Sequence, residues 1–143
     1  MAKEGLGNGF DVVAVADGVY LNLKDVGGVT FVGLLAGGDD FTVTEATSAA
    51  GAGAQNLAVF DKTYSQTDGD GTDTWTENDE GGLVAVANAH TTDAACAIYV
   101  DAKDLSDGFT HVACTATSTG IVVAILHDLK DQRKPTNLPA RAA

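Results

Sequence analysis

Apolar and polar residues alternate in short runs along most of this chain. In residues 19–24, for example, Val19, Leu21 and Leu23 alternate with Tyr, Asn and Lys. A period of two places successive side chains on opposite faces of a strand, so such runs are typical of half-buried β-strands. Gly and Asp separate the runs, as they do at turns. The runs that predict strands are 10–16, 19–24, 29–36, 41–46, 57–64, 95–101, 109–116 and 120–126, and 83–89 fits either a strand or a helix.

The spacing of these runs predicts the fold class. About seven to nine short strands recur at intervals of roughly ten residues, and little of the chain favours helix. We therefore expect a mainly β, single-domain antiparallel sandwich or barrel with extended terminal arms. The predicted layout is an N-terminal arm at 1–9, a β domain at 10–129 and a basic C-terminal arm at 130–143. Pro135 and Pro139 favour an arm there, because proline is unsuited to the interior of a sheet.

The most specific structural prediction concerns the neighbouring strands 95–101 and 109–116. A hairpin in which paired residue numbers sum to 210 sets Cys96 beside Cys114 and makes the apolar faces of the two strands coincide. A shift by one residue would put those faces on opposite sides of the sheet. We expect the two cysteines to be adjacent buried thiols rather than a disulfide, because we also expect the chain to fold in a reducing compartment.

Composition and charge narrow the classes of function. The 143-residue chain has a formal net charge of −12, which argues against a nucleic-acid partner, because such a partner needs a basic surface. The charge is uneven. Residues 1–129 hold 4 basic and 19 acidic side chains, whereas residues 130–143 have a net charge of +3. No apolar run has the length of a signal peptide or a membrane span, so we expect synthesis in the cytoplasm and no membrane partner.

Candidate catalytic and metal-binding residues are few. His111 and Cys114 lie three apart on one predicted strand, which points them to opposite faces rather than into a catalytic dyad. We therefore expect no enzyme activity, no catalytic residues and no cofactor. The polar loop at 65–82 holds weak candidates for calcium binding, but its spacing lacks the glycine and the final glutamate of an EF-hand. These candidates are Asp68, Asp70 and Asp73.

Binding or assembly is the expected role of a chain without a catalytic site. The basic tail suits an acidic protein neighbour electrostatically. Trp75 stands alone in the polar loop, where an exposed ring can stack on a sugar or anchor a partner, and packing onto its own loop is the alternative. The candidate partner-binding residues are Phe10, Lys130, Arg133, Lys134, Leu138 and Arg141.

Two stretches of the chain resemble small structural proteins of tailed bacteriophages. The first stretch is 29–64. Within it, Leu34-Leu35 and residues 45–57, EATSAAGAGAQNL, are similar to a pattern that these proteins share, of a strand followed by Gln/Glu-Ala-Thr, a small residue, Ala-Gly-x-Gly-Ala and Leu. Residues 101–109, DAKDLSDGF, are similar to their acidic-Ala-x-Asp-Leu followed by Asp-Gly-Phe. The resemblance covers about two thirds of the chain, and the long Asp/Gly loop at 65–82 departs from it.

The resemblance implies a head decoration protein, also called a capsid-stabilising or cement protein. Such proteins are small β-rich units, often trimeric, that bind the outside of the capsid where its subunits meet. The implied partners are the major capsid protein and further copies of this chain, and the implied location is the capsid surface of the virion. Two other functions stay open: a β-sandwich that binds a carbohydrate or calcium, and a subunit of a phage tail tube or connector.

Overall fold

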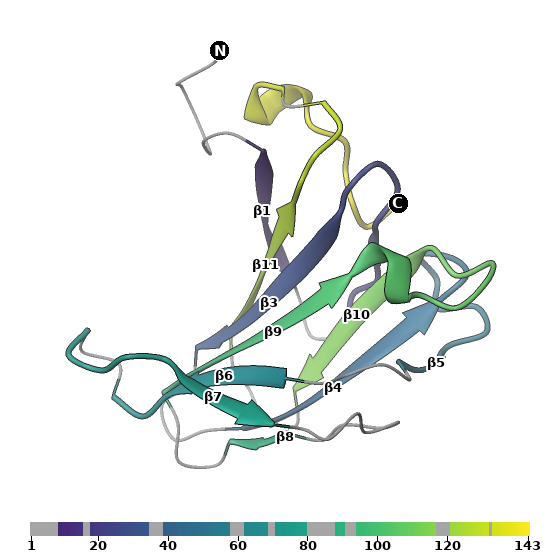
Figure 1. Cartoon of the computed structure of the whole chain (residues 1–143). Coiled ribbons are helices and arrows are strands. Elements are labelled where there is room, and N and C mark those ends of the chain that lie inside the picture. Colours follow the sequence, from purple (N-terminus) through teal and green to yellow (C-terminus); the bar gives the residue numbers. More distant parts are fainter. Residues whose placement is uncertain are drawn as a thin grey trace.

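The protein folds as two antiparallel β-sheets that enclose one core, as the computed structural model shows (Figure 1). The predicted mainly β fold is confirmed. Within the residues that the structure describes, no helix is long and apolar enough to cross a membrane. The structure describes residues 9–15, 18–34, 39–57, 62–68, 71–79, 88–90, 94–116, 121–131 and 133–143.

The larger sheet has six strands in the order β1-β11-β3-β9-β6-β7, and the smaller has five, β2-β10-β4-β5 with β8 paired to β4. The strands of the larger sheet are β1 (Phe10–Val15), β3 (Gly28–Leu34), β6 (Lys62–Gln66), β7 (Thr76–Asp79), β9 (Ala95–Asp101) and β11 (Ile121–His127). Those of the smaller sheet are β2 (Leu21–Asn22), β4 (Asp39–Ala46), β5 (Gln55–Asn56), β8 (Asn88–His90) and β10 (His111–Ala116). Two short 3-10 helices are η1 (Ala102–Asp104) and η2 (Pro135–Asn137).

The described residues form more strands than the seven to nine that the sequence predicts. β2 falls within the predicted run 19–24 and β8 overlaps the run at 83–89, so the elements without a predicted run are β5, which is two residues long, and β7. β7 lies within the segment 65–82 that was expected to be one long loop, where it pairs with β6. Its sequence, Thr-Glu-Asn-Asp, has no apolar alternation, so the pattern gives no signal for a strand there. The run at 83–89 lies mostly outside the described residues.

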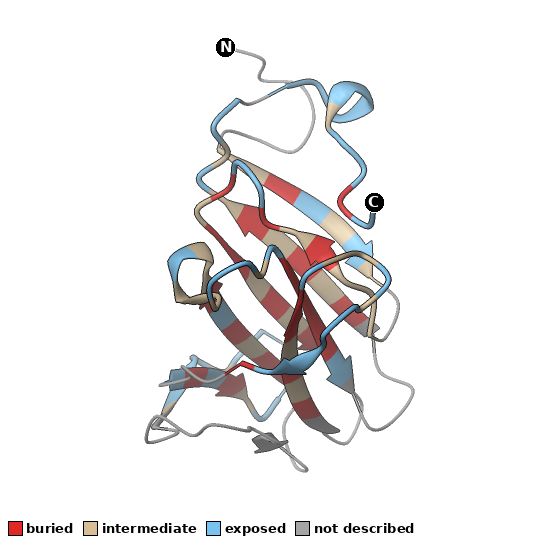
Figure 2. Cartoon of the chain, turned by 90° about the vertical axis from the view of Figure 1, so that its right-hand side faces the viewer, coloured by how far each residue is buried: buried red, intermediate tan, exposed pale blue. Residues whose placement is uncertain are grey.

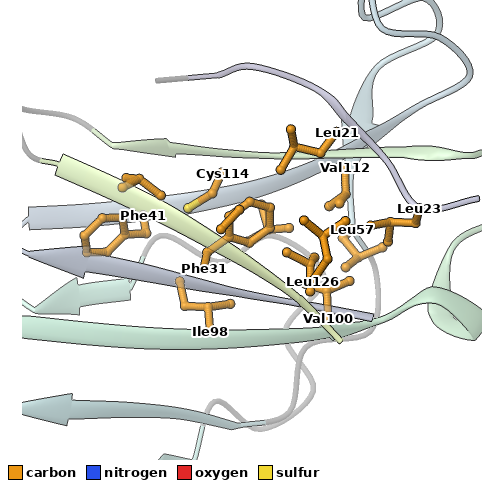
Figure 3. Close-up of a cluster of buried hydrophobic side chains, with 14 of the residues drawn as sticks. Leu21, Leu23, Phe31, Phe41, Leu57, Ile98, Val100, Val112, Cys114 and Leu126 are labelled. Carbon is orange, nitrogen blue, oxygen red and sulfur yellow. The ribbon is translucent and has the colours of Figure 1, made fainter. Parts of the chain in front are cut away.

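Side chains from both sheets meet in the core (Figure 3). Phe31, Ile98 and Leu126 come from the larger sheet, Phe41 and Val112 from the smaller, and all five are at most 2% exposed. Burying each such side chain contributes about 1.5–3 kcal/mol, so this cluster is the main stabilising feature of the fold. The strands alternate between buried and more exposed positions, as the banding in Figure 2 shows, which matches the period-two pattern of the sequence.

The predicted hairpin of residues 95–101 and 109–116 is wrong. β9 lies in the larger sheet between β3 and β6, whereas β10 lies in the smaller sheet between β2 and β4. Cys96 and Cys114 therefore face one core from opposite sheets rather than lying beside each other in one sheet, and both are buried thiols that no disulfide joins. Alternation shows which face of a strand is apolar. It is satisfied equally when two apolar faces meet across a core and when they lie side by side.

The two stretches that carry the phage resemblance meet at a buried carboxylate. Glu45 on β4 is fully buried, and its oxygens accept hydrogen bonds from Gln55 Nε2 (2.7 Å) and from the backbone N–H of Ser106 (2.8 Å). Glu45 and Gln55 belong to the first stretch and Ser106 to the second. Buried charged groups require such partners. These motifs therefore hold in place the connection from β9 to β10, which passes from the larger sheet to the smaller.

Candidate functional site

The outer face of the larger sheet, away from the core, carries exposed apolar side chains. Pairing of β11 with β1 and β3 sets apolar residues of the three strands side by side on this face. Leu34 is 50% exposed and Val12 is 37% exposed. Exposed apolar surface of this kind marks contact sites more often than scattered single residues do. The aliphatic patch, as we call it, consists of Val12, Ala14, Val32, Leu34, Val123 and Ile125.

A groove of about 420 Å³ lies beside the aliphatic patch on the same face. Tyr64 and Tyr99, which project from the neighbouring strands β6 and β9, are 38% and 47% exposed. The groove therefore presents two aromatic rings to solvent. The lining residues are Thr30, Tyr64, Ala97, Tyr99, His127 and Asp128.

One wall of the groove is Tyr64, whose hydroxyl is bound by the ion pair of Glu77 and Lys62. Its hydroxyl donates to Glu77 Oε2 (3.0 Å), and the same carboxylate accepts from Lys62 Nζ (2.6 Å). The hydrogen bond to Glu77 and the charge of that group raise the pKa of Tyr64. The hydrogen bonds from Lys62 and Tyr64 lower the pKa of Glu77. Glu77 lies on β7, the strand that the sequence pattern does not reveal.

The opposite wall is Tyr99, which packs against His127 and over a glycine. The two ring centroids are 5.9 Å apart, and His127 Nε2 lies 2.6 Å from Thr30 Oγ1. A Cβ at Gly28 would lie 2.6 Å from the Tyr99 hydroxyl oxygen, so glycine makes room for the phenol. Burial, followed by the charges of nearby aspartates, raises the pKa of Tyr99. Asp128 takes a left-handed conformation (φ 54°) and lies at the rim of the groove.

The sequence gives a partial signal for this groove. In the run 95–101 the inward positions are Cys96, Ile98 and Val100, so Tyr99 stands outward, where polar residues are the norm. The partner strands that bring Tyr64 and His127 to the same place are not encoded in any local pattern.

Arg141 does not present a free cation to a partner. Its side chain is buried, its Nη1 donates to the backbone oxygen of Lys24 (3.1 Å), and its Nε lies 3.9 Å from Asp11 Oδ2. Its own backbone oxygen accepts from the N–H of Asn22 (2.8 Å). These contacts hold the end of the predicted C-terminal arm against the β domain. The structure thus gives Arg141 an intramolecular role that its charge and position in the sequence did not suggest.

Of the other predicted partner-binding residues, Arg133 lines a groove of about 410 Å³ together with Arg141. Lys130 Nζ lies 3.9 Å from Asp25 Oδ1, and its side chain is exposed. Phe10 is half-buried on β1, the edge strand of the larger sheet. Arg133 and Lys134 are exposed and Leu138 is half-buried, all three within or beside η2.

The acidic loop uses one of its calcium candidates to hold its own backbone. Asp73 Oδ2 accepts from the backbone N–H groups of Thr67 (2.9 Å) and Asp68 (3.0 Å). Asp68 is exposed, and Asp70 lies outside the described residues. In the described part of the chain, no three metal-ligating side chains come together. Trp75, in the same loop, is 47% exposed.

Comparisons with known proteins add no assignment to these features. No protein-family model, curated protein or solved structure matches the chain.

Proposed function

We propose that this protein is a structural virion protein that coats a tailed-phage capsid. It binds the outside of the shell as a decoration, or cement, protein and forms an oligomer that bridges capsid subunits. The aliphatic patch carries the proposal, since it offers a contact surface on a chain otherwise suited to solubility. The resemblance at residues 45–57 and 101–109 directs the proposal to a phage capsid.

Charge supports the choice of this surface. The chain has a net charge of −12, so two copies repel each other over most of their surfaces. The aliphatic patch contains no ionisable side chain, so a second copy or a capsid subunit can meet it without bringing like charges together. Protein contacts form through such uncharged cores surrounded by a polar rim.

The size of the patch favours assembly on a surface over a stable oligomer in dilute solution. Three strands about 4.8 Å apart, with a few alternating residues on each, cover roughly 200–300 Å². A stable interface buries about 800 Å² on each partner. The patch thus supplies the centre of a contact. Many copies held side by side on a shell gain strength from high local concentration without needing a larger patch.

A charged substitution in the patch tests the proposal. Capsids assembled from the major capsid protein of the same phage are incubated with the wild-type chain or with Leu34→Glu, and occupancy is counted by electron cryomicroscopy. Leu34 is half exposed, so the variant should fold, and its occupancy should fall about tenfold or more because a buried, unpaired carboxylate opposes the contact.

The matched control is Ala54→Glu, which adds the same charge at an exposed alanine of the 47–54 turn. We expect its occupancy to equal that of the wild type. Absence of wild-type binding to the capsid contradicts the proposed function. Full occupancy by a folded Leu34→Glu contradicts the assignment of the patch as the contact surface.

A further inference from the structure

We propose that the groove between Tyr64 and Tyr99 binds a neutral saccharide ring. The groove lies beside the aliphatic patch and shares no residue with it. The proposal therefore goes beyond capsid binding and does not depend on it. It rests on the placement of two aromatic rings, on the contacts that hold them, and on the polar groups at the rim.

Strand register places the two tyrosines on either side of a small residue. Tyr64 on β6 pairs with Ala97 on β9, and Tyr99 follows two positions along β9. Residues in this diagonal relation point to the same face with Cβ atoms about 7 Å apart, within reach of aromatic side chains. Because the side chain of Ala97 is small, it leaves the space between the two rings open. The resulting space of about 420 Å³ falls in the range of about 300–1,000 Å³ that small-ligand sites occupy.

Both rings are held in place before any ligand arrives. The hydroxyl of Tyr64 is tied to Glu77, which Lys62 holds in turn. Tyr99 lies over Gly28 and against the ring of His127. Side chains that are already ordered lose little entropy on binding, so rigid exposed rings bind more tightly than mobile ones. Each exposed ring leaves apolar surface in contact with water, and a stacked ligand would cover that surface.

The chemistry of the lining selects a sugar. A pyranose has apolar C–H faces, which suit the aromatic walls, and a rim of hydroxyl groups, which need donors and acceptors. Thr30 and His127 supply both kinds of group, and the carboxylate of Asp128 accepts hydrogen bonds. The surroundings are acidic, so phosphorylated or sulfated sugars are disfavoured by charge repulsion. The ligand is therefore a neutral sugar.

An alkylammonium ion is the competing ligand, because cations are attracted to aromatic faces and to carboxylates. Thr30 Oγ1 and His127 Nε2 are hydrogen-bonded to each other at 2.6 Å and keep one further donor and one further acceptor between them, which a sugar hydroxyl can use and a quaternary ammonium group cannot. Tetramethylammonium chloride is accordingly included in the test as the cation probe.

Saturation-transfer NMR and calorimetric titration of the full chain test the proposal. The probes are the methyl glycosides of glucose, galactose, mannose and N-acetylglucosamine, together with their short oligosaccharides. We expect at least one to bind with a Kd below about 10 mM. Tyr99→Ala should weaken that binding about tenfold, in line with the energy of one stacked ring.

The matched control is Trp75→Ala, because Trp75 is also 47% exposed but does not line the groove. Its affinity should stay within about twofold of the wild type. Tyr64→Ala provides a second wall variant, to be used if Tyr99→Ala fails to fold. The proposal is overturned by the absence of saturable binding of any sugar below about 10 mM, by unchanged affinity in a folded wall variant, or by binding of tetramethylammonium alone.

Discussion

Gly33 shows how a single residue sets the distance between the two sheets. It lies on β3 with Phe41 of the smaller sheet directly above it, and a Cβ at this position would overlap the Phe41 ring. Phe41 is 2% exposed, so the ring would have to shift within the packed core to admit a Cβ at position 33. Glycine is thus required at position 33 by packing across the core, not by backbone conformation.

We predict that Gly33→Ala lowers the free energy of unfolding by about 1–3 kcal/mol, the usual cost of overfilling a packed core. Urea denaturation measures the change. In Phe41→Leu the ring is gone, so adding Gly33→Ala to that variant should cost much less. The double-mutant cycle is the control, and strictly additive effects of the two substitutions would argue against this explanation.

Glu77 controls the ionisation of Tyr64 at the wall of the groove. Because the hydrogen bond to Glu77 and its charge raise the pKa of Tyr64, we predict that Glu77→Gln moves this pKa back towards the ordinary value of 10.0. NMR titration of the tyrosine ring carbons measures the shift. Tyr99, whose raised pKa has burial as its first cause, is the internal control and should change little.

The same pair predicts a dependence of stability on pH. A pKa that is higher in the folded than in the unfolded chain means that folding favours the protonated phenol. The contribution is fully present below the unfolded pKa and is lost as pH rises through the folded pKa. Alkaline unfolding of the wild type should therefore be steeper above pH 10.0 than that of Glu77→Gln. Identical alkaline unfolding curves would contradict this coupling.

At the scale of whole strands, the sequence predicts which segments are extended but not which strands are neighbours. The runs at 10–16, 29–36 and 120–126 become β1, β3 and β11 with small changes at their ends. Partners are set by the packing of distant segments, which no local period reports. This is why the hairpin of 95–101 and 109–116 was predicted in place of two strands in opposite sheets.

The candidate site was only partly predictable for the same reason. Alternation places Tyr99 outward, but the groove also needs β6 on one side and β11 on the other. It further needs Glu77, on a strand without an apolar pattern. Alternation does place Glu45 on the buried face with Phe41 and Val43, but it does not report the partners that a buried glutamate needs there. Its partners come from two other segments of the chain.

The connection from β9 to β10, which passes between the two sheets, is held in place by Glu45. We predict that Glu45→Ala lowers the free energy of unfolding by about 2–4 kcal/mol, because it creates a cavity and removes the acceptor of the Ser106 N–H. Native-state hydrogen exchange should show that the Ser106 amide loses protection first. Glu77→Ala, which removes an exposed carboxylate, is the control and should change stability by less than about 1 kcal/mol. Equal effects of the two variants would contradict the structural role of Glu45.

For the molecule as a whole, the basic C-terminal segment of this acidic chain makes contacts within its own fold. Residues 130–143 carry a net charge of +3, and the rest of the chain carries −15. The one buried cation of the tail in the described residues, Arg141, lies beside buried Asp11 and closes the edge between β1 and β2. Part of the charge difference is thus used to hold the C-terminal segment on the β domain.

Removing residues 139–143 should therefore destabilise the β domain itself. The deletion takes away the backbone bond to Asn22 and the bond to Lys24, and it removes the cation beside Asp11. We predict a loss of about 2–4 kcal/mol in unfolding free energy, measured by urea denaturation at constant m. Lys134→Ala, which removes an exposed tail charge, should change it by less than about 0.5 kcal/mol. If the truncated chain is as stable as the wild type and only capsid occupancy falls, the segment is an arm for a partner and not part of the fold.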